Sequence, residues 1–176
     1  MKMSDTPGSA STVARAVINK YPKIESKPLD GNKVELVVPI EKIRDVVAML
    51  DEEISDALPE SMFGVDLTEN KYELIYIFWS HLGKMLIQLR VQLEGETPEI
   101  ESVADIFPGL EWHERETHEL FGIGFKNHPD LRPLLLPEEL EGQFPLRKSF
   151  KTDRSRMDET GLPKPKPRPA PRGESS

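Results

Sequence analysis

The sequence predicts an α+β fold, in which helices pack on one face of an antiparallel β-sheet and an extended C-terminal tail follows. Three patterns support this expectation. Residues 39–58 carry apolar side chains at the alternating three- and four-residue spacing of an amphipathic helix. Residues 62–94 hold three runs rich in β-branched and aromatic residues, separated by polar breaks. From residue 151 onward apolar residues nearly vanish, and prolines take alternate positions from Pro163 to Pro171, which is typical of extended chain.

The N-terminal third predicts a helix followed by two strands. Residues 11–22 suit a short helix with Ser11 or Thr12 near its N-cap, and the helix should end before Pro22. Residues 24–29 and 32–39 read as two strands around Asp30-Gly31, a dipeptide suited to a tight hairpin turn. The helix expected over residues 39–58 comes next, and its apolar stripe consists of Ile40, Ile43, Val47, Leu50 and Ile54.

The three runs that follow, residues 62–69, 71–80 and 84–94, predict an antiparallel meander. The middle run is apolar on both faces, so it should be the central strand. In the last run apolar and polar residues alternate, which directs one face to the core and the other to water or a partner. Residues 99–122 then look helical, with a break at Pro108-Gly109 and a stop at Gly122. We therefore expect one domain over residues 1–150 and a proline-rich basic tail over residues 151–176.

Composition excludes several kinds of site. Cysteine is absent, so this chain carries no disulfide, thiolate zinc site, cysteine nucleophile or cysteine-ligated iron–sulfur cluster. The net charge of −8 divides into +3 on residues 151–176 and −11 on residues 1–150, which makes the body a poor nucleic-acid binder and suits the tail to an acidic surface. The N-terminus has no apolar secretory stretch, and charged residues far outnumber Asn and Gln; we expect a cytoplasmic protein from a heat-adapted source.

Residues 113–122, HERETHELFG, raise the question of a metal site. His113 and His118 are five residues apart, so on a helix they diverge by about 140° and cannot share an ion without help from elsewhere in the chain. The Glu-x-x-His spacing of di-iron sites is also missing. The simplest interpretation is an ion-pair ladder in which Arg115 lies between Glu111 and Glu119 on one helix face. A free-standing enzyme with His113, Glu114 or His118 as acid and base is a competing hypothesis.

Residues 114–135, ERETHELFGIGFKNHPDLRPLL, resemble the signature of the 30-kilodalton subunit of respiratory complex I. The residues that meet its fixed positions are Glu114, Arg115, Glu116, Glu119, Leu120, Phe121, His128, Arg132, Leu134 and Leu135. The flanking segments agree over about residues 60–150. The sequence departs from the family pattern in a one-residue longer EGQFPLRKSF segment, in Ser149 where aspartate is common, in a short N-terminal region and in the proline-rich tail.

The resemblance implies a hydrophilic, non-catalytic subunit of a membrane-bound, ion-translocating oxidoreductase, held peripherally on the cytoplasmic side of the membrane. Such a subunit binds no cofactor itself and packs against a large subunit that houses a nickel–iron site or descends from one, beside iron–sulfur subunits. We expect the helix and loop over residues 110–148 to dock there, and the tail to wrap over neighbouring subunits. The interface residues predicted on this basis are Glu114, Arg115, Glu116, Glu119, Leu120, Phe121, His128, Arg132, Arg147 and Lys148.

Composition and the departures favour a ferredoxin-linked membrane-bound hydrogenase or a sulfur-reducing complex. The corresponding subunit of an NADH-quinone or coenzyme-F420-oxidising complex is the alternative within the same family. A stand-alone adaptor, whose proline-rich tail binds a groove in a partner, is the alternative from another class.

Overall fold

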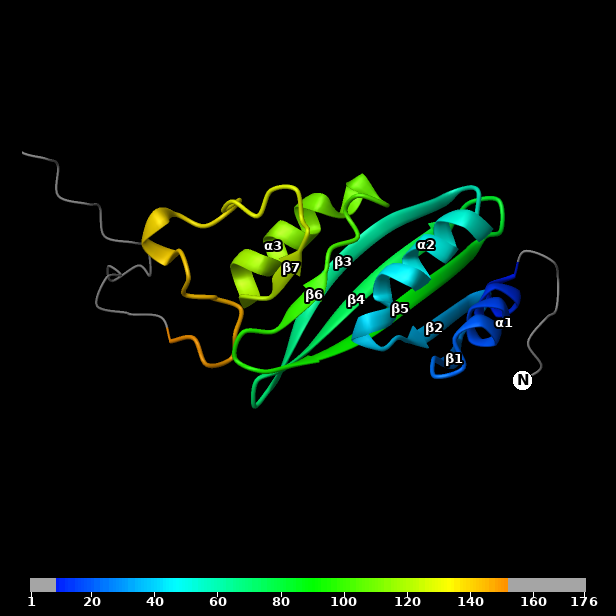
Figure 1. The fold of residues 1–176 in the computed structure, drawn as a ribbon, viewed down its shortest axis with the longest axis horizontal. Helices are drawn as coiled ribbons and strands as arrows, with labels where there is room; N and C mark the ends of the chain where they lie inside the picture. The colour runs from blue at the N-terminus through cyan, green and yellow to red at the C-terminus, as the bar shows by residue number, and fades with distance from the viewer. Residues whose placement is uncertain (1–8, 152–176) are drawn as a thin grey trace, which may run out of the picture.

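The computed structural model describes residues 9–151 (Figure 1). Its centre is a five-stranded sheet in the order β1-β2-β5-β4-β3. The strands are β1 (Glu25–Leu29), β2 (Lys33–Val37), β3 (Ala57–Thr68), β4 (Lys71–Ser80) and β5 (Met85–Glu94). A second sheet of two short parallel strands, β6 (Glu99–Glu101) and β7 (Gly124–Lys126), lies beside it. The helices are α1 (Ala10–Lys20), α2 (Ile43–Glu53) and α3 (Glu111–Phe121).

The α+β class is confirmed, and the large sheet is mixed rather than wholly antiparallel. The β1–β2 hairpin and the β3–β4–β5 meander are antiparallel, as predicted. Strand β2, however, pairs with β5 in parallel, with Lys33 opposite Leu86 and Val37 opposite Arg90. After β2 the chain forms α2 and then β3, which is the strand at the opposite edge of the sheet. Strands β4 and β5 follow in order back toward β2, so β5 is the strand that pairs with β2.

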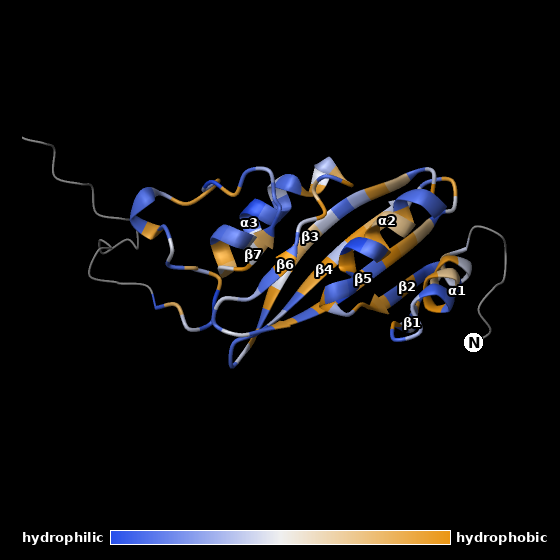
Figure 2. Cartoon of the chain, in the orientation of Figure 1, coloured by the Kyte–Doolittle hydropathy of each residue, from blue (hydrophilic) through white to orange (hydrophobic). Residues whose placement is uncertain are grey.

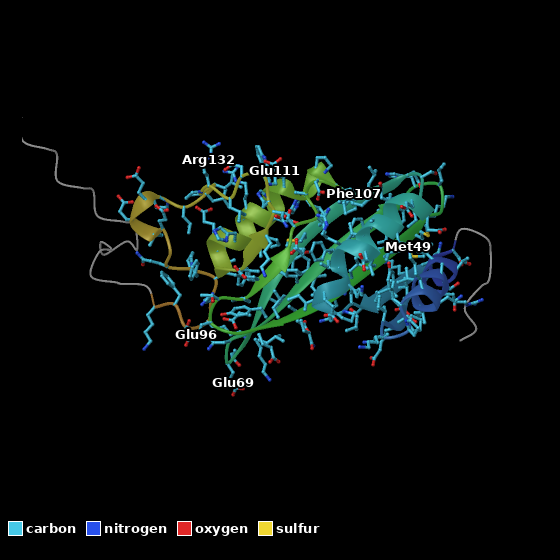
Figure 3. All side chains as sticks on the ribbon, viewed as in Figure 1. Met49, Glu69, Glu96, Phe107, Glu111 and Arg132 are labelled. Atoms are coloured by element: carbon cyan, nitrogen blue, oxygen red, sulfur yellow. The ribbon has the colours of Figure 1, made fainter. Side chains whose placement is uncertain are left out.

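All three helices lie on one face of the large sheet, as predicted. Strand register places Met62, Tyr76 and Leu89 side by side, and these residues belong to the same core cluster as the buried residues of the helices. Figure 2 shows the alternation along β5 as bands of hydrophobic and hydrophilic residues, and Figure 3 labels Met49, a core residue of α2. The burial of one alternating set of side chains explains why the periodicity of the strands was visible in the sequence.

Several element boundaries differ from the sequence predictions. The N-cap of α1 is Ser9, whose side chain accepts a hydrogen bond from the Thr12 amide, rather than Ser11 or Thr12. Helix α2 follows a 3-10 turn, η1 (Ile40–Lys42), and ends at Glu53, because the chain must turn into β3 at residue 57. Residues 99–107 form β6 and a turn instead of a helix. Two further 3-10 turns are η2 (Pro108–Leu110) and η3 (Glu138–Leu140).

Helix α3 lies close against β3 because glycine leaves room for it. A Cβ atom at Gly64 would meet the ring of Phe121 at 3.0 Å and the methyl group of Thr117 at 3.3 Å. A larger residue at this position would therefore displace the helix. Within residues 9–151 no helix is both long and apolar enough to cross a membrane. The predicted tail lies outside the described residues, apart from its first residue, Lys151.

Candidate functional site

The charged segment HERETHELFG forms most of helix α3, and its first glutamate points into the protein. Glu114 is fully buried, and its carboxylate accepts hydrogen bonds from the Ser102 hydroxyl (2.5 Å) and the Val103 amide (2.8 Å). Burial raises the pKa of Glu114 to about 7, against the opposing effect of these two hydrogen bonds. No cation forms a salt bridge with this carboxylate among the described residues, apart from the histidine contact at His128. Glu114 therefore fastens α3 to the segment that precedes it.

The side chain of His128 is a second buried polar group, and it lies next to Glu114. Its Nδ1 atom accepts a hydrogen bond from the Asp130 amide (3.0 Å), so the ring proton lies on Nε2, which donates to the carbonyl of Glu111 (3.1 Å). The Nε2 atom lies 3.9 Å from Oε2 of Glu114, and both side chains are fully buried. His128 thus holds the start of the following loop against the start of α3.

Glu119 fixes a later part of the same loop. Its two carboxylate oxygens accept hydrogen bonds from the amides of Leu135 and Leu136, each at 2.8 Å. The side chain is 8% exposed, so the carboxylate is directed to its own chain. Hydrogen bonds to a carboxylate are stronger than those between neutral groups, which makes Glu119 an anchor for residues 135–136 of the loop.

Arg115 does not form the predicted ion-pair ladder with Glu111 and Glu119. Its guanidinium instead donates to the carbonyl of Arg132 (3.0 Å) and the carbonyl of Pro133 (3.1 Å). Figure 3 labels Glu111 and Arg132 at the edge of the molecule where the loop returns over α3. The long-range return of the loop captures the arginine, which the helical spacing alone could not reveal.

The C-terminal end of α3 is closed by a glycine and an arginine. Gly122 adopts a φ of +70° and caps the helix through a hydrogen bond from its amide to the carbonyl of His118 (2.8 Å). A Cβ atom at this position would lie 2.6 Å from the ring of Phe144. Arg147 donates to the carbonyl of Phe121 (2.6 Å) and lies over the ring of Phe144, 4.6 Å from its centre. Residues 144–147 are therefore tied back to α3.

The histidines of this segment face different carbonyl groups. His113 Nδ1 lies 3.2 Å from the carbonyl of Gly109, and His118 Nδ1 lies 2.8 Å from the carbonyl of Ile123. With Glu114 directed inward, the acid and base residues of the competing enzyme hypothesis are not brought together. Within the described residues no group of three or more His, Cys, Asp or Glu side chains could hold a metal ion.

The predicted interface residues divide by exposure. Glu114, Glu119, Phe121 and the side chain of His128 are buried, Arg115, Leu120 and Arg147 are half-buried, and Glu116, Arg132 and Lys148 are exposed. Sequence reasoning missed three exposed large apolar residues in the same segment: Trp112 (65%), Leu135 (60%) and Leu146 (53%). The sequence did contain a signal for the exposure of Trp112. This residue lies four positions before Glu116, so both side chains are on the same, polar face of the helix. The assignment of all these residues to an interface stays a prediction.

Comparison with known proteins identifies the family. The model of the respiratory-chain NADH dehydrogenase 30 kDa subunit matches residues 36–156, which is more than half of the chain. The chain belongs to this 30 kDa subunit family. The resemblance read from residues 114–135 is thereby confirmed.

Relatives within the 30 kDa subunit family come from different complexes. The C subunit of the F(420)H(2) dehydrogenase of Methanosarcina mazei is 33% identical over 80% of this chain and 91% of its own length. The C subunit of the NADH-quinone oxidoreductase of Roseiflexus sp. strain RS-1 is 38% identical over 61% of this chain, which spans only 64% of that relative.

Solved structures agree with this assignment. A chain in the structure of the membrane-bound sulfane sulfur reductase, an archaeal respiratory membrane complex, superimposes with a TM-score of 0.74 and 25% identity, over 82% of this chain and 87% of that chain. A trypsin-resistant fragment of Nqo5 superimposes with a TM-score of 0.57 and 23% identity, over 68% of this chain and 99% of the fragment, and shares the fold. The chain is thus a complex I-like 30 kDa subunit of a membrane-bound oxidoreductase.

Proposed function

We propose that this chain is a cofactor-free assembly subunit in the peripheral arm of an ion-translocating complex on the cytoplasmic side of the membrane. It docks on the large nickel–iron-type subunit and lies beside iron–sulfur subunits, which carry the redox centres. The sulfane sulfur reductase likeness supports a sulfur-reducing or hydrogenase-type complex. The absence of cysteine from the chain fits a subunit that ligates no cluster.

The docking site proposed is the α3 surface, which we define as Trp112, Glu116, Leu135 and Leu146. The first two residues lie on α3, and the two leucines are held beside it. Glu119 binds the Leu135 amide, and the Leu146 amide donates to the carbonyl of Leu120 (3.1 Å). The proposal is based on one observation: large apolar side chains are exposed on a segment that internal hydrogen bonds hold in place. Exposed apolar side chains of this kind are typical of protein–protein interfaces. The buried carboxylates hold this surface in shape, and its exposed residues meet the partner.

Charge-introducing variants test the proposal. The double variant Trp112→Glu, Leu135→Glu should reduce the amount of large subunit that co-purifies with the tagged chain at least tenfold, because each new carboxylate would be buried without a partner. The matched control is Leu82→Glu, which changes a residue that is 81% exposed in the β4–β5 turn, away from α3. Equal recovery of the large subunit with the double variant and with the control would contradict docking through this surface.

A second candidate is the corresponding subunit of an F(420)H(2)-oxidising complex. The Methanosarcina relative favours it, since this chain covers 91% of that protein. Identification of the chains that co-purify from gently solubilised membranes separates the two. A nickel–iron large subunit supports the hydrogenase or sulfur-reducing assignment, whereas an F(420)H(2)-oxidising flavoprotein supports the second candidate. A chain that fractionates away from membranes and from every oxidoreductase would instead be the stand-alone adaptor.

A further inference from the structure

The face of the large sheet that points away from the helices carries an apolar band, which Ser61 interrupts on β3. We define the apolar band as Leu58, Phe63 and Val65 on β3 and Ile75, Ile77 and Trp79 on β4. Strand pairing places Phe63 opposite Ile75 and Leu58 opposite Trp79, so the residues adjoin across the two strands. Phe63 is 43% and Leu58 is 47% exposed, whereas Val65, Ile77 and Trp79 are half-buried and Ile75 is 5% exposed. An antiparallel sheet normally turns polar residues toward water on such a face.

Beside the apolar band, three charged residues of the same face, Glu35, Glu73 and Arg90, are paired with one another. Arg90 on β5 bridges Glu35 on β2 (2.8 Å) and Glu73 on β4 (2.5 Å). Gln88 and Gln92 donate further hydrogen bonds to these two glutamates. Glu35 and Glu73 are only 6% and 8% exposed. A partner could therefore cover these three residues without separating their charges, and the triad keeps one negative charge in excess that a basic group of the partner could meet.

The dimensions of the band suit one helix. From Leu58 to Val65 it pairs with six steps of β4, because of the irregularity between Pro59 and Ser61, and so extends about 20 Å at about 3.3 Å per residue; two adjacent strands make it about 10 Å wide. An α-helix with its side chains is about 10–12 Å across, and about 13 residues span this length. The band therefore matches the apolar stripe of one amphipathic helix.

Charge decides among the possible occupants. Residues 151–176 carry seven Lys or Arg residues and few apolar ones, so the tail of this chain is a poor match for the apolar band. A second copy is disfavoured because each chain has a net charge of −8. A helix from another chain that has basic flanks complements the charge of −11 on residues 1–150.

We propose that the apolar band is a second docking face, which an amphipathic helix of a different chain of the same complex covers with its apolar stripe and borders with basic residues. This inference rests on the proposed function, because it needs the complex to supply the partner. With α3 on one side of the sheet and the apolar band on the other, the subunit bridges two neighbours.

Single-cysteine labelling of the intact complex tests the second docking face, since the chain has no cysteine of its own. Phe63→Cys and Val65→Cys report on the apolar band, and Glu52→Cys, exposed on α2, is the matched control on the helical side. We expect a maleimide probe to label the two band cysteines at least tenfold more slowly in the complex than in the free full-length chain. The control should label at similar rates in both. Circular dichroism of the free variants verifies that each one folds.

A cysteine-reactive photo-crosslinker at position 63 then identifies the occupant. We expect a cross-link to a helix of another subunit whose apolar stripe is flanked by Lys or Arg. Equal labelling rates in the complex and in the free chain would overturn the inference, as would a cross-link between two copies of this chain. Protection that disappears when residues 151–176 are deleted from a chain that still joins the complex would assign the band to the tail and would overturn the inference as well. If the chain joins no complex, the proposed function is contradicted. If the chain joins the complex but the cysteine at position 63 reacts there as fast as in the free chain, only this inference is contradicted.

Discussion

Replacement of Glu114 by glutamine should remove a specific pH dependence of stability. Burial raises the pKa of this carboxyl from 4.5 to about 7. The folded protein therefore keeps the proton up to about pH 7, while the unfolded chain releases it near pH 4.5. The stability that this proton contributes is fully present below the lower value and is lost as the pH rises through the upper one. At about 1.4 kcal/mol per pKa unit, ionisation of Glu114 lowers the free energy of unfolding by about 3 kcal/mol at pH 8.5.

Glutamine imitates the protonated carboxyl, because its carbonyl can accept from the Val103 amide and its amide can donate to the Ser102 hydroxyl. Urea unfolding followed by circular dichroism should give similar stabilities for wild type and Glu114→Gln at about pH 4, below the pKa of the unfolded chain. At about pH 8.5 the variant should be more stable by about 3 kcal/mol. Glu116→Gln, an exposed change on the same helix, is the control and should follow the wild-type curve. Parallel pH profiles for wild type and Glu114→Gln would refute the reasoning.

Three further predictions concern the loop and the tail. Gly122→Ala should lower the free energy of unfolding by about 1–3 kcal/mol, because alanine is strained at this φ and meets the ring of Phe144; an unchanged urea midpoint would argue against this. Arg147→Met should cost about 1.5–3 kcal/mol by removing the charged hydrogen bond to Phe121 and should speed chymotrypsin cleavage near residue 144; unchanged cleavage would mean that the arginine does not hold the segment. Deletion of residues 151–176 should leave the circular dichroism spectrum unchanged but weaken assembly of the complex, as measured by co-purification; undiminished assembly would exclude a clamping role.

Local patterns predicted the elements of this fold better than their long-range pairing. The alternation of Ile87, Leu89 and Val91 with polar residues identified β5 and its buried face, because one face of that strand meets the core. The parallel pairing of β2 with β5 has no local signature, since it brings Val34 beside Ile87 across α2 and an entire hairpin. The sequence analysis also missed the start of β3 at Ala57. This strand lies at an open edge of the sheet and carries polar residues there, so its local pattern is not that of a buried strand.

The charged segment stood out in the sequence, but its contacts could be predicted only in part. In α3 and the turn before it, the buried positions Leu110, Glu114, Thr117 and Phe121 follow helical spacing, so Glu114 occupies the apolar stripe of the helix. This spacing was available in the sequence and would have predicted a buried carboxyl. The capture of Arg115 by backbone carbonyls of the loop was not available, since it depends on where residues 132 and 133 return.

Cross-linking mass spectrometry on the complex purified through this chain tests the central claim most directly. A short photo-crosslinker at position 112 or 135, on the α3 surface, should join this chain to the large nickel–iron-type subunit. The cross-link should decrease when Leu146→Glu is introduced in the same background, because this change adds a charge to the proposed interface. Recovery of the chain without any oxidoreductase subunit, or an intact complex in which neither position cross-links to the large subunit, would contradict the account.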